Sequence, residues 1–169
     1  MPEPKKHAEN RNFVESILRR VPGFRGYLEK EYRRESDELQ RKWLADRLRT
    51  AKSALDELAK RLVDEVRIDD IPRVERVRNR LEKLIGRIDG AMQGYSGVFD
   101  LVRINETVLD KVYDHDVAMM EQTEKTAEAV ESLKAHDPDL VGSLDRVLEQ
   151  IDALEDVWTG RDQILKGLD

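Results

Sequence analysis

The sequence predicts an all-α protein with two long helical hairpins, which form either a four-helix bundle or an elongated antiparallel coiled coil. Apolar side chains recur in alternating steps of three and four residues, the spacing of one face of a helix. Charged residues make up 39% of the chain, against about 25% in an ordinary globular domain, and this favours long, exposed helices. Short β-branched clusters are too few to build a sheet.

Residues 1–23 form a first segment, a tail followed by a short amphipathic helix that ends at Pro22 and Gly23. At about 100° per residue its apolar side chains fill one arc, with basic side chains beside it. The candidate face for a membrane or a partner is Phe13, Val14, Ile17, Leu18, Arg19 and Arg20. Such a helix can dock onto the rest of the chain, onto a membrane interface or into a partner's groove.

Residues 24–169 form the helical domain, and its first hairpin spans residues 28–92. The first helix, residues 28–66, has an apolar seam of Leu44, Leu48, Ala51, Leu55, Leu58 and Leu62. The stretch RIDDIPRVER predicts a stop and a restart, in which Asp70 caps the next helix and Pro72 lies in its first turn. The second helix has a seam of Val74, Val77, Leu81, Leu84 and Ile88.

A glycine-aromatic connection, residues 94–104, joins the two hairpins. Glycines at 86, 90 and 94 follow one another every four residues, which indicates either a chain reversal or a smooth stripe for close backbone approach. The first helix would be roughly 58 Å long and the second roughly 33 Å, so Trp43 is expected to contact Tyr95 and Phe99. The candidate aromatic contact comprises Phe24, Tyr27, Trp43, Tyr95 and Phe99.

The second hairpin spans residues 105–166. Its first helix, residues 105–135, has an expected inward face of Leu109, Val112, Val117, Met120, Ala127, Val130 and Leu133. Asp137 and Pro138 start the last helix, whose seam is Leu140, Leu144, Val147, Ile151, Leu154, Trp158 and Leu165. Asp116 is expected on the seam, as a polar residue that sets the register of the helices.

Charge is distributed unevenly along the chain. Residues 1–90 carry 23 basic and 18 acidic side chains, and residues 91–169 carry 7 and 18. Two ridges follow helical spacing: a basic one of Arg73, Arg76, Arg80, Lys83 and Arg87, and an acidic one of Glu121, Glu124, Glu128 and Glu131. We expect these ridges to pair within the chain or between copies, with a basic face for anionic lipid as the alternative.

Several classes of chemistry are disfavoured by the residues present. The chain has no cysteine, which removes disulfides, thiol nucleophiles and cysteine-based zinc sites. No Glu-x-x-His spacing for a di-iron bundle, no phosphate-binding loop and no dinucleotide motif occurs. The prediction is therefore a protein that is not an enzyme and has no catalytic residue, metal or cofactor.

Two resemblances bear on the fold. The motifs VPGFRGY and GYSGVFD, the latter followed by INETVLDKVYDHD, resemble a family of uncharacterised bacterial helical proteins. The resemblance covers roughly residues 21–120 and implies that the two glycine-aromatic motifs belong together. An amphipathic N-terminal helix followed by long charged helices is similar to phage-shock-protein A and its ESCRT-III relatives.

The leading hypothesis is a helical scaffold or adaptor that acts through coiled-coil self-association or by binding another helical protein. The alternative is a peripheral membrane protein, in an envelope-stress or membrane-remodelling context, whose N-terminal helix inserts at an anionic bilayer. No apolar run is long enough to span a membrane, and a cytoplasmic location, with or without membrane attachment, is expected. Nucleic acid is not an expected partner, because the chain is acidic and lacks interleaved stacking aromatics.

Overall fold

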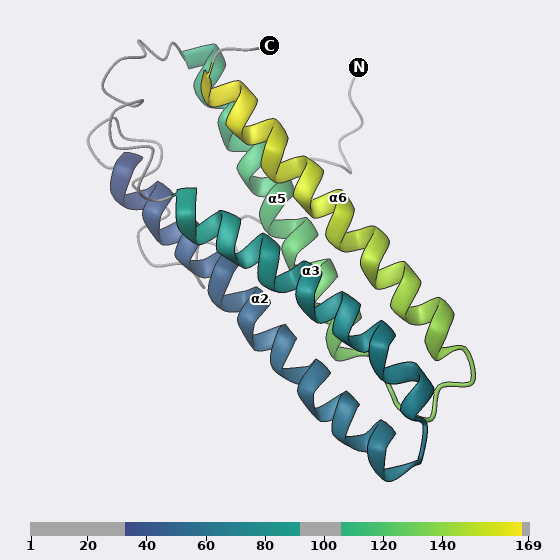
Figure 1. Cartoon of the computed structure of the whole chain (residues 1–169). Helices are drawn as coiled ribbons and strands as arrows, with labels where there is room; N and C mark the ends of the chain where they lie inside the picture. The colour runs from purple at the N-terminus through teal and green to yellow at the C-terminus, as the bar shows by residue number, and fades with distance from the viewer. Residues whose placement is uncertain (1–32, 92–105, 167–169) are drawn as a thin grey trace. The chain divides into compact units, whose positions relative to one another are not determined.

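The computed structural model describes residues 33–91 and 106–166. These residues form four α-helices and one short 3-10 helix: α2 Arg33–Asp64, η2 Ile68–Asp70, α3 Ile71–Gly90, α5 Glu106–Glu131 and α6 Leu140–Lys166 (Figure 1). No strand occurs in these two ranges, so the described part is all-α as predicted. The chain divides into two units, Met1–Trp43 and Leu44–Asp169, and the packing described below is that of the second unit.

The apolar seams predicted for α2, α3 and α6 form the core of this unit. All the described seam residues are buried: Leu44, Leu48, Ala51, Leu55, Leu58, Leu62, Val74, Val77, Leu81, Leu84, Ile88, Leu140, Leu144, Val147, Ile151, Leu154 and Trp158. Their side chains are at most 5% exposed, and burial of each large aliphatic contributes about 1.5–3 kcal/mol. The prediction is confirmed for these three helices.

The inward face of α5 is more polar than predicted. Val117 and Leu133 are only partly buried, whereas Thr123 and Thr126 are fully buried. The Thr123 hydroxyl donates to the Met119 carbonyl at 2.8 Å, and the Thr126 hydroxyl donates to the Gln122 carbonyl at 2.8 Å. Because the helix itself satisfies each hydroxyl, burying the threonines leaves no polar group unpaired.

The turn after α2 is a Schellman motif, the two-bond pattern that commonly ends a helix. The Arg67 N–H donates to the Leu62 carbonyl at 2.8 Å, and the Val66 N–H donates to the Val63 carbonyl at 3.0 Å. This geometry places Val66 at a φ of +59°, in the left-handed region that β-branched residues rarely occupy.

The start of α3 differs in one detail from the prediction. Asp70 is the N-cap residue and a proline lies in the first turn, but the Asp70 side chain makes no capping hydrogen bond. Its carboxylate instead accepts a hydrogen bond from the Arg67 Nε at 2.9 Å. The expectation that Asp70 caps α3 through its side chain was therefore wrong, because a nearby guanidinium holds the carboxylate.

The connection from α5 to α6 begins earlier than predicted, since α5 ends at Glu131 and not near residue 135. Asp137 holds the connection together: its carboxylate accepts from the Asp139 N–H at 2.9 Å and from the Ser143 hydroxyl at 2.8 Å. These two hydrogen bonds lower the pKa of Asp137. Asp139 then caps α6 by accepting from the Gly142 N–H at 3.3 Å.

Gly86 and Gly90 lie within α3, and a Cβ added to either would meet no atom within 4 Å. Of the two alternatives, neither holds at Gly86 and Gly90: both lie in a helix and not in a chain reversal, and no described atom approaches them closely. Gly94, the third residue of the predicted stripe, lies outside the described residues.

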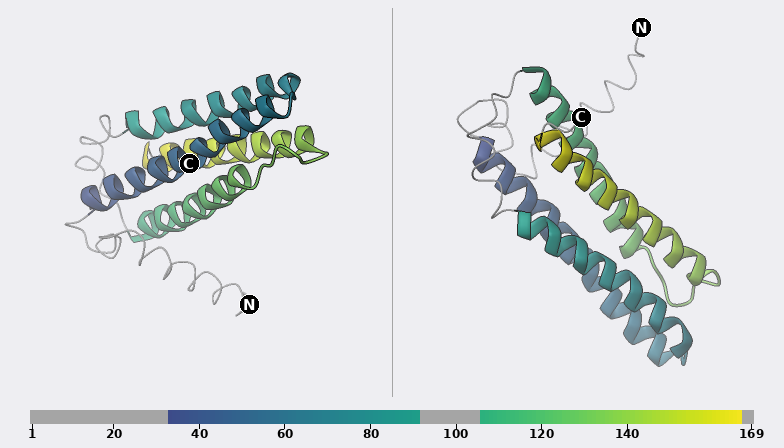
Figure 2. Two further views of the ribbon diagram at one scale, coloured as in Figure 1. Left: turned by 90° about the horizontal axis from the view of Figure 1, so that it is seen from below. Right: turned by 45° about the horizontal axis from the view of Figure 1, so that its top comes forward.

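In the second unit, α5 lies along α6, and α3 also contacts α6 (Figures 1 and 2). Among the described residues, no helix is long and apolar enough to cross a membrane.

Candidate functional site

Regularly spaced ion pairs join α3 to α6. Arg80 pairs with Asp152 and also lies 3.3 Å from Glu155. Arg87 pairs with Glu155, and its Nη2 donates to the Thr159 hydroxyl at 3.3 Å. A weaker contact, 3.7 Å, joins Arg73 to Asp145.

The contacts of Arg73, Arg80 and Arg87 with Asp145, Asp152 and Thr159 each span the same separation, 72 residues. Because the partner numbers rise together, α3 and α6 run in the same direction. The seven-residue steps place successive pairs two helical turns apart along the interface. We call this row the α3–α6 ladder; it fixes the register of two helices that are far apart in sequence.

A second set of ion pairs joins α2 to α3. Arg49 pairs with Asp89, and Lys52 lies 3.3 Å from Glu82. Farther along α2, Asp56 lies 3.5 Å from Arg78. Here the partner numbers fall as the α2 numbers rise, so α2 and α3 run in opposite directions.

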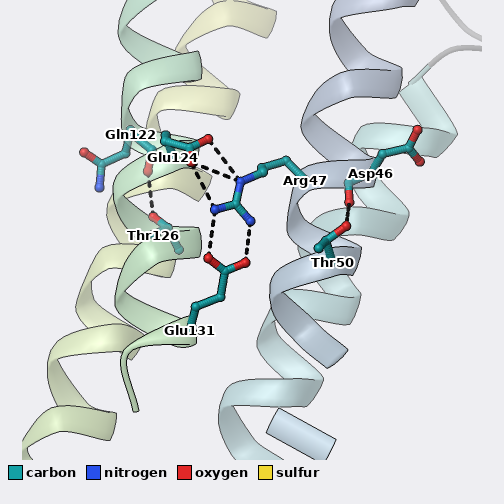
Figure 3. Close-up of polar contacts among 7 residues, drawn as sticks. All are labelled: Asp46, Arg47, Thr50, Gln122, Glu124, Thr126 and Glu131. Atoms are coloured by element: carbon teal, nitrogen blue, oxygen red, sulfur yellow. Dashed lines mark hydrogen bonds and ion pairs between the residues drawn. The ribbon is translucent and has the colours of Figure 1, made fainter. Parts of the chain in front are cut away.

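Arg47 joins α2 to α5 (Figure 3). Its Nε and Nη2 donate to Glu124 at distances of 3.0–3.2 Å, and its Nη1 and Nη2 donate to Glu131 at 2.6 and 3.0 Å. The two glutamates lie seven residues apart, so one fork-shaped guanidinium connects two turns of α5. The bond from Arg47 lowers the pKa of Glu131, and the bonds to Glu131 and Glu124 raise the pKa of Arg47.

The most buried ion pair joins α5 to α6. The Arg161 Nε donates to the Asp116 Oδ1 at 2.6 Å, with both side chains at most 2% exposed. The Arg161 guanidinium also lies 6.0 Å from the centroid of the Trp158 ring, within reach of a cation–π interaction. The pair confirms the expectation that Asp116 lies on the seam, where a charged group needs a charged partner.

His115 lies next to this pair in the chain. Its Nδ1 is buried without a hydrogen-bond partner, and burial lowers the pKa of its imidazole. A Cβ added to Gly160 would lie 3.2 Å from the His115 Nε2. Gly160 therefore leaves room for the imidazole against α6.

An aliphatic tip lies at the junction of α2 and α3. Val63, Val66 and Ile68 are 55%, 78% and 60% exposed, the large hydrophobic side chains that stand out to solvent among the described residues. Arg67, between the last two, donates to the carbonyls of Ala135 and Asp137 beyond α5. These hydrogen bonds of Arg67 hold the tip against the α5–α6 connection.

A hollow of about 230 Å³ lies between the C-terminal part of α5 and the N-terminal part of α6. Its lining combines two serines, Arg146 and Gln150 with small and aliphatic side chains. The Gln150 Oε1 is buried without a hydrogen-bond partner. Among the described residues, no group of three His, Asp or Glu side chains could hold a metal ion.

Among the described residues, the two predicted ridges find partners on other helices. Arg73, Arg80 and Arg87 contact acidic residues of α6 although Arg73 and Arg87 remain exposed, and Arg76 and Lys83 are also exposed. Glu124 and Glu131 bind Arg47, and Glu121 pairs with Lys125 four residues on, while Glu128 is exposed. The two ridges thus contact different helices and not each other.

The predicted N-terminal face lies outside the described residues, as do Phe24, Tyr27, Tyr95 and Phe99. Trp43 is described and partly buried, but its predicted contact with Tyr95 and Phe99 stays a prediction.

Arg161 and Arg47 were missed by the sequence analysis. Arg161 lies three residues after Trp158, so it continues the seam of α6 as Asp116 continues that of α5. The opposite charges of Asp116 and Arg161, each on the seam of its helix, were the signal that could have predicted this ion pair. No comparable signal identifies Arg47, because its partners depend on α2 lying beside α5.

Comparisons of the chain with protein-family models, with curated proteins and with solved structures found no match. The two motifs behind the first resemblance lie largely outside the described residues, and both resemblances remain expectations.

Proposed function

We propose that this protein is a non-enzymatic helical scaffold whose four helices form a four-helix bundle and whose exposed end binds protein. The bundle is a ring in which α2 neighbours α3 and α5, and α6 neighbours α3 and α5. Charged contacts at all four interfaces support this order. In this ring the two hairpins lie side by side, with α3 parallel to α6.

This arrangement changes the role expected for the heptad seams. The seam side chains of α2, α3 and α6 are already buried in a single chain, so they do not need a second copy to leave water. The arginines of the ladder also find their partners inside the chain. Two copies could pair through these seams only if the bundle first opened. We therefore place the binding site on the surface of the bundle.

The observation that carries the proposal is the aliphatic tip. Exposed aliphatic groups that cluster on a surface otherwise rich in charge are a common feature of interaction sites. Val63, Val66 and Ile68 lie within six residues at one end of the bundle and are each more than half exposed.

Site-specific photo-crosslinking in the native host tests this function. A photoreactive amino acid placed at Val66 should form protein adducts, whereas the same amino acid at Asp156, an exposed position on α6, should form few. The absence of adducts at position 66, or equal yields at both positions, would refute the proposal that the tip binds protein.

A further inference from the structure

The backbone conformation of Val66 at the tip is unfavourable for a residue with a side chain. Val66 occupies the position of a Schellman motif that is usually glycine, at a φ of +59°. A residue with a Cβ costs about 1–2 kcal/mol in this region, and the side chain gains nothing from burial because it is 78% exposed. Backbone strain of this kind is concentrated at functional sites.

The tip is also held in place before any partner arrives. Arg67 forms an ion pair of 2.6 Å with Asp70 and donates to the carbonyls of Ala135 and Asp137. Val66 and Ile68 flank Arg67 in the chain, so these bonds fix the backbone that carries both side chains. A fixed surface loses little conformational entropy on binding.

The exposed charged residues that lie among the aliphatic residues of the tip, or directly beside them, are acidic: Asp64, Glu65 and Asp69. Exposed basic residues, Lys60, Arg61 and Arg73, lie on the adjoining turns of α2 and α3. A partner that complements the acidic residues of the tip therefore presents apolar side chains flanked by arginine or lysine. The same acidic charges repel an anionic bilayer, which argues for a protein partner over a membrane.

The chain itself contains such a segment. The helix predicted from the sequence between residues 11 and 21 would have an apolar arc of Phe13, Val14, Ile17, Leu18 and Val21, with Arg11, Arg19 and Arg20 beside it. The segment has one acidic residue, Glu15. Its apolar and basic character matches the apolar and acidic character of the tip.

We propose that the aliphatic tip of one copy binds residues 11–21 of a second copy. This inference rests on the proposed function, because it names the partner of the same surface. The contact joins two different patches, so it is heterologous and builds rings or open chains of copies. The tip is small, so assembly is weak, dependent on concentration and reduced by salt.

Sedimentation velocity on the full-length chain, over a concentration series at low and high salt, tests the inference. The wild type should associate at low salt and dissociate at high salt. Asp64→Lys with Glu65→Lys, and separately Arg19→Glu with Arg20→Glu, should each weaken association at least about tenfold. Glu149→Lys with Asp156→Lys makes the same charge change at exposed positions on α6 and should leave association unchanged.

Mixing the two weakened variants is the sharper experiment. The lysines of the tip variant are opposite in charge to the glutamates of the segment variant, so the mixture should regain the association that each variant lacks alone. Variants that had merely failed to fold would not complement each other in this way.

Val66→Gly separates contact from folding. It relieves the backbone strain and should raise the unfolding temperature, yet it removes an aliphatic contact and should weaken association about tenfold. A monomer at all concentrations, or association that survives both Val66→Gly and the tip charge reversal, would overturn the inference. A photo-adduct from position 66 that contains only another protein would also overturn it, while leaving the proposed function in place.

Discussion

Val66 is the residue at which the local rules and the structure disagree most. Its left-handed backbone at the end of α2 suits glycine, and its side chain is mostly exposed. Val66→Gly should therefore stabilise the fold by about 1 kcal/mol, measured by urea unfolding. Val63→Gly, inside α2 and also more than half exposed, is the control and should destabilise slightly, by about 0.3–0.5 kcal/mol. Loss of stability in Val66→Gly would mean that Val66 contributes to the fold in a way that its exposure hides.

The buried pair of Asp116 and Arg161 is the second residue-scale feature. Removing one partner leaves an unpaired charge in the core, so Asp116→Leu alone and Arg161→Met alone should each destabilise by about 3–5 kcal/mol. Replacing both, as Asp116→Leu with Arg161→Met, should cost less than the sum of the single changes, because no charge is stranded. Urea unfolding of the four proteins measures the coupling, and additive effects would contradict the pairing.

At the scale of single helices, α3 contains a glycine that its packing does not require. Gly86 lies inside α3, and a Cβ there would meet nothing within 4 Å. Gly86→Ala should therefore stabilise by about 1 kcal/mol, the difference in helix propensity, as measured by thermal unfolding. Gly160→Ala in α6 is the contrasting variant, because its Cβ would press on His115 at 3.2 Å and should forfeit much of that gain.

The contact between α2 and α5 predicts a dependence on pH. The bond from Arg47 lowers the pKa of Glu131 below its ordinary 4.5, so the folded state favours the ionised carboxylate. The stabilisation is present above pH 4.5 and is lost as the pH falls through the lowered pKa. The free energy of unfolding of the wild type should fall on acidification, and that of the Glu131→Gln variant should fall less steeply.

Urea unfolding at neutral pH and below pH 4.5 measures this difference. Glu128→Gln removes an exposed carboxylate three residues earlier on α5 and should keep the wild-type pH dependence. Equal pH dependence in both variants would rule out the role given to Glu131.

The sequence predicted helices well where a regular apolar seam was also the buried face. In α3, the steps from Val74 to Ile88 indicated the core directly, and every described member is buried. In α5 the same method failed at Thr123 and Thr126, because hydroxyls that bond to their own helix can be buried although threonine reads as polar.

At the scale of the whole molecule, the partners of charged residues could not be predicted. The sequence marked Arg80 and Glu124 as ridge residues, but the ridge pattern does not say which helix lies opposite. Arg80 contacts α6 and Glu124 contacts α2, an outcome that depends on how the two hairpins are placed side by side. The 72-residue offset becomes visible only after α3 and α6 are known to be neighbours.

The most direct test of the account is a cysteine crosslink across the α3–α6 ladder. The chain has no cysteine, so Arg80→Cys with Asp152→Cys creates a unique pair for a short bis-maleimide linker. A control pair, Arg73→Cys with Asp152→Cys, is shifted by seven residues, or roughly 10 Å along the helix, and should react much less. Because Arg80 and Asp152 pair within the chain, the crosslink should form within one chain and be independent of protein concentration. Crosslinks formed only between two copies, with a yield that rises with concentration, would contradict this pairing.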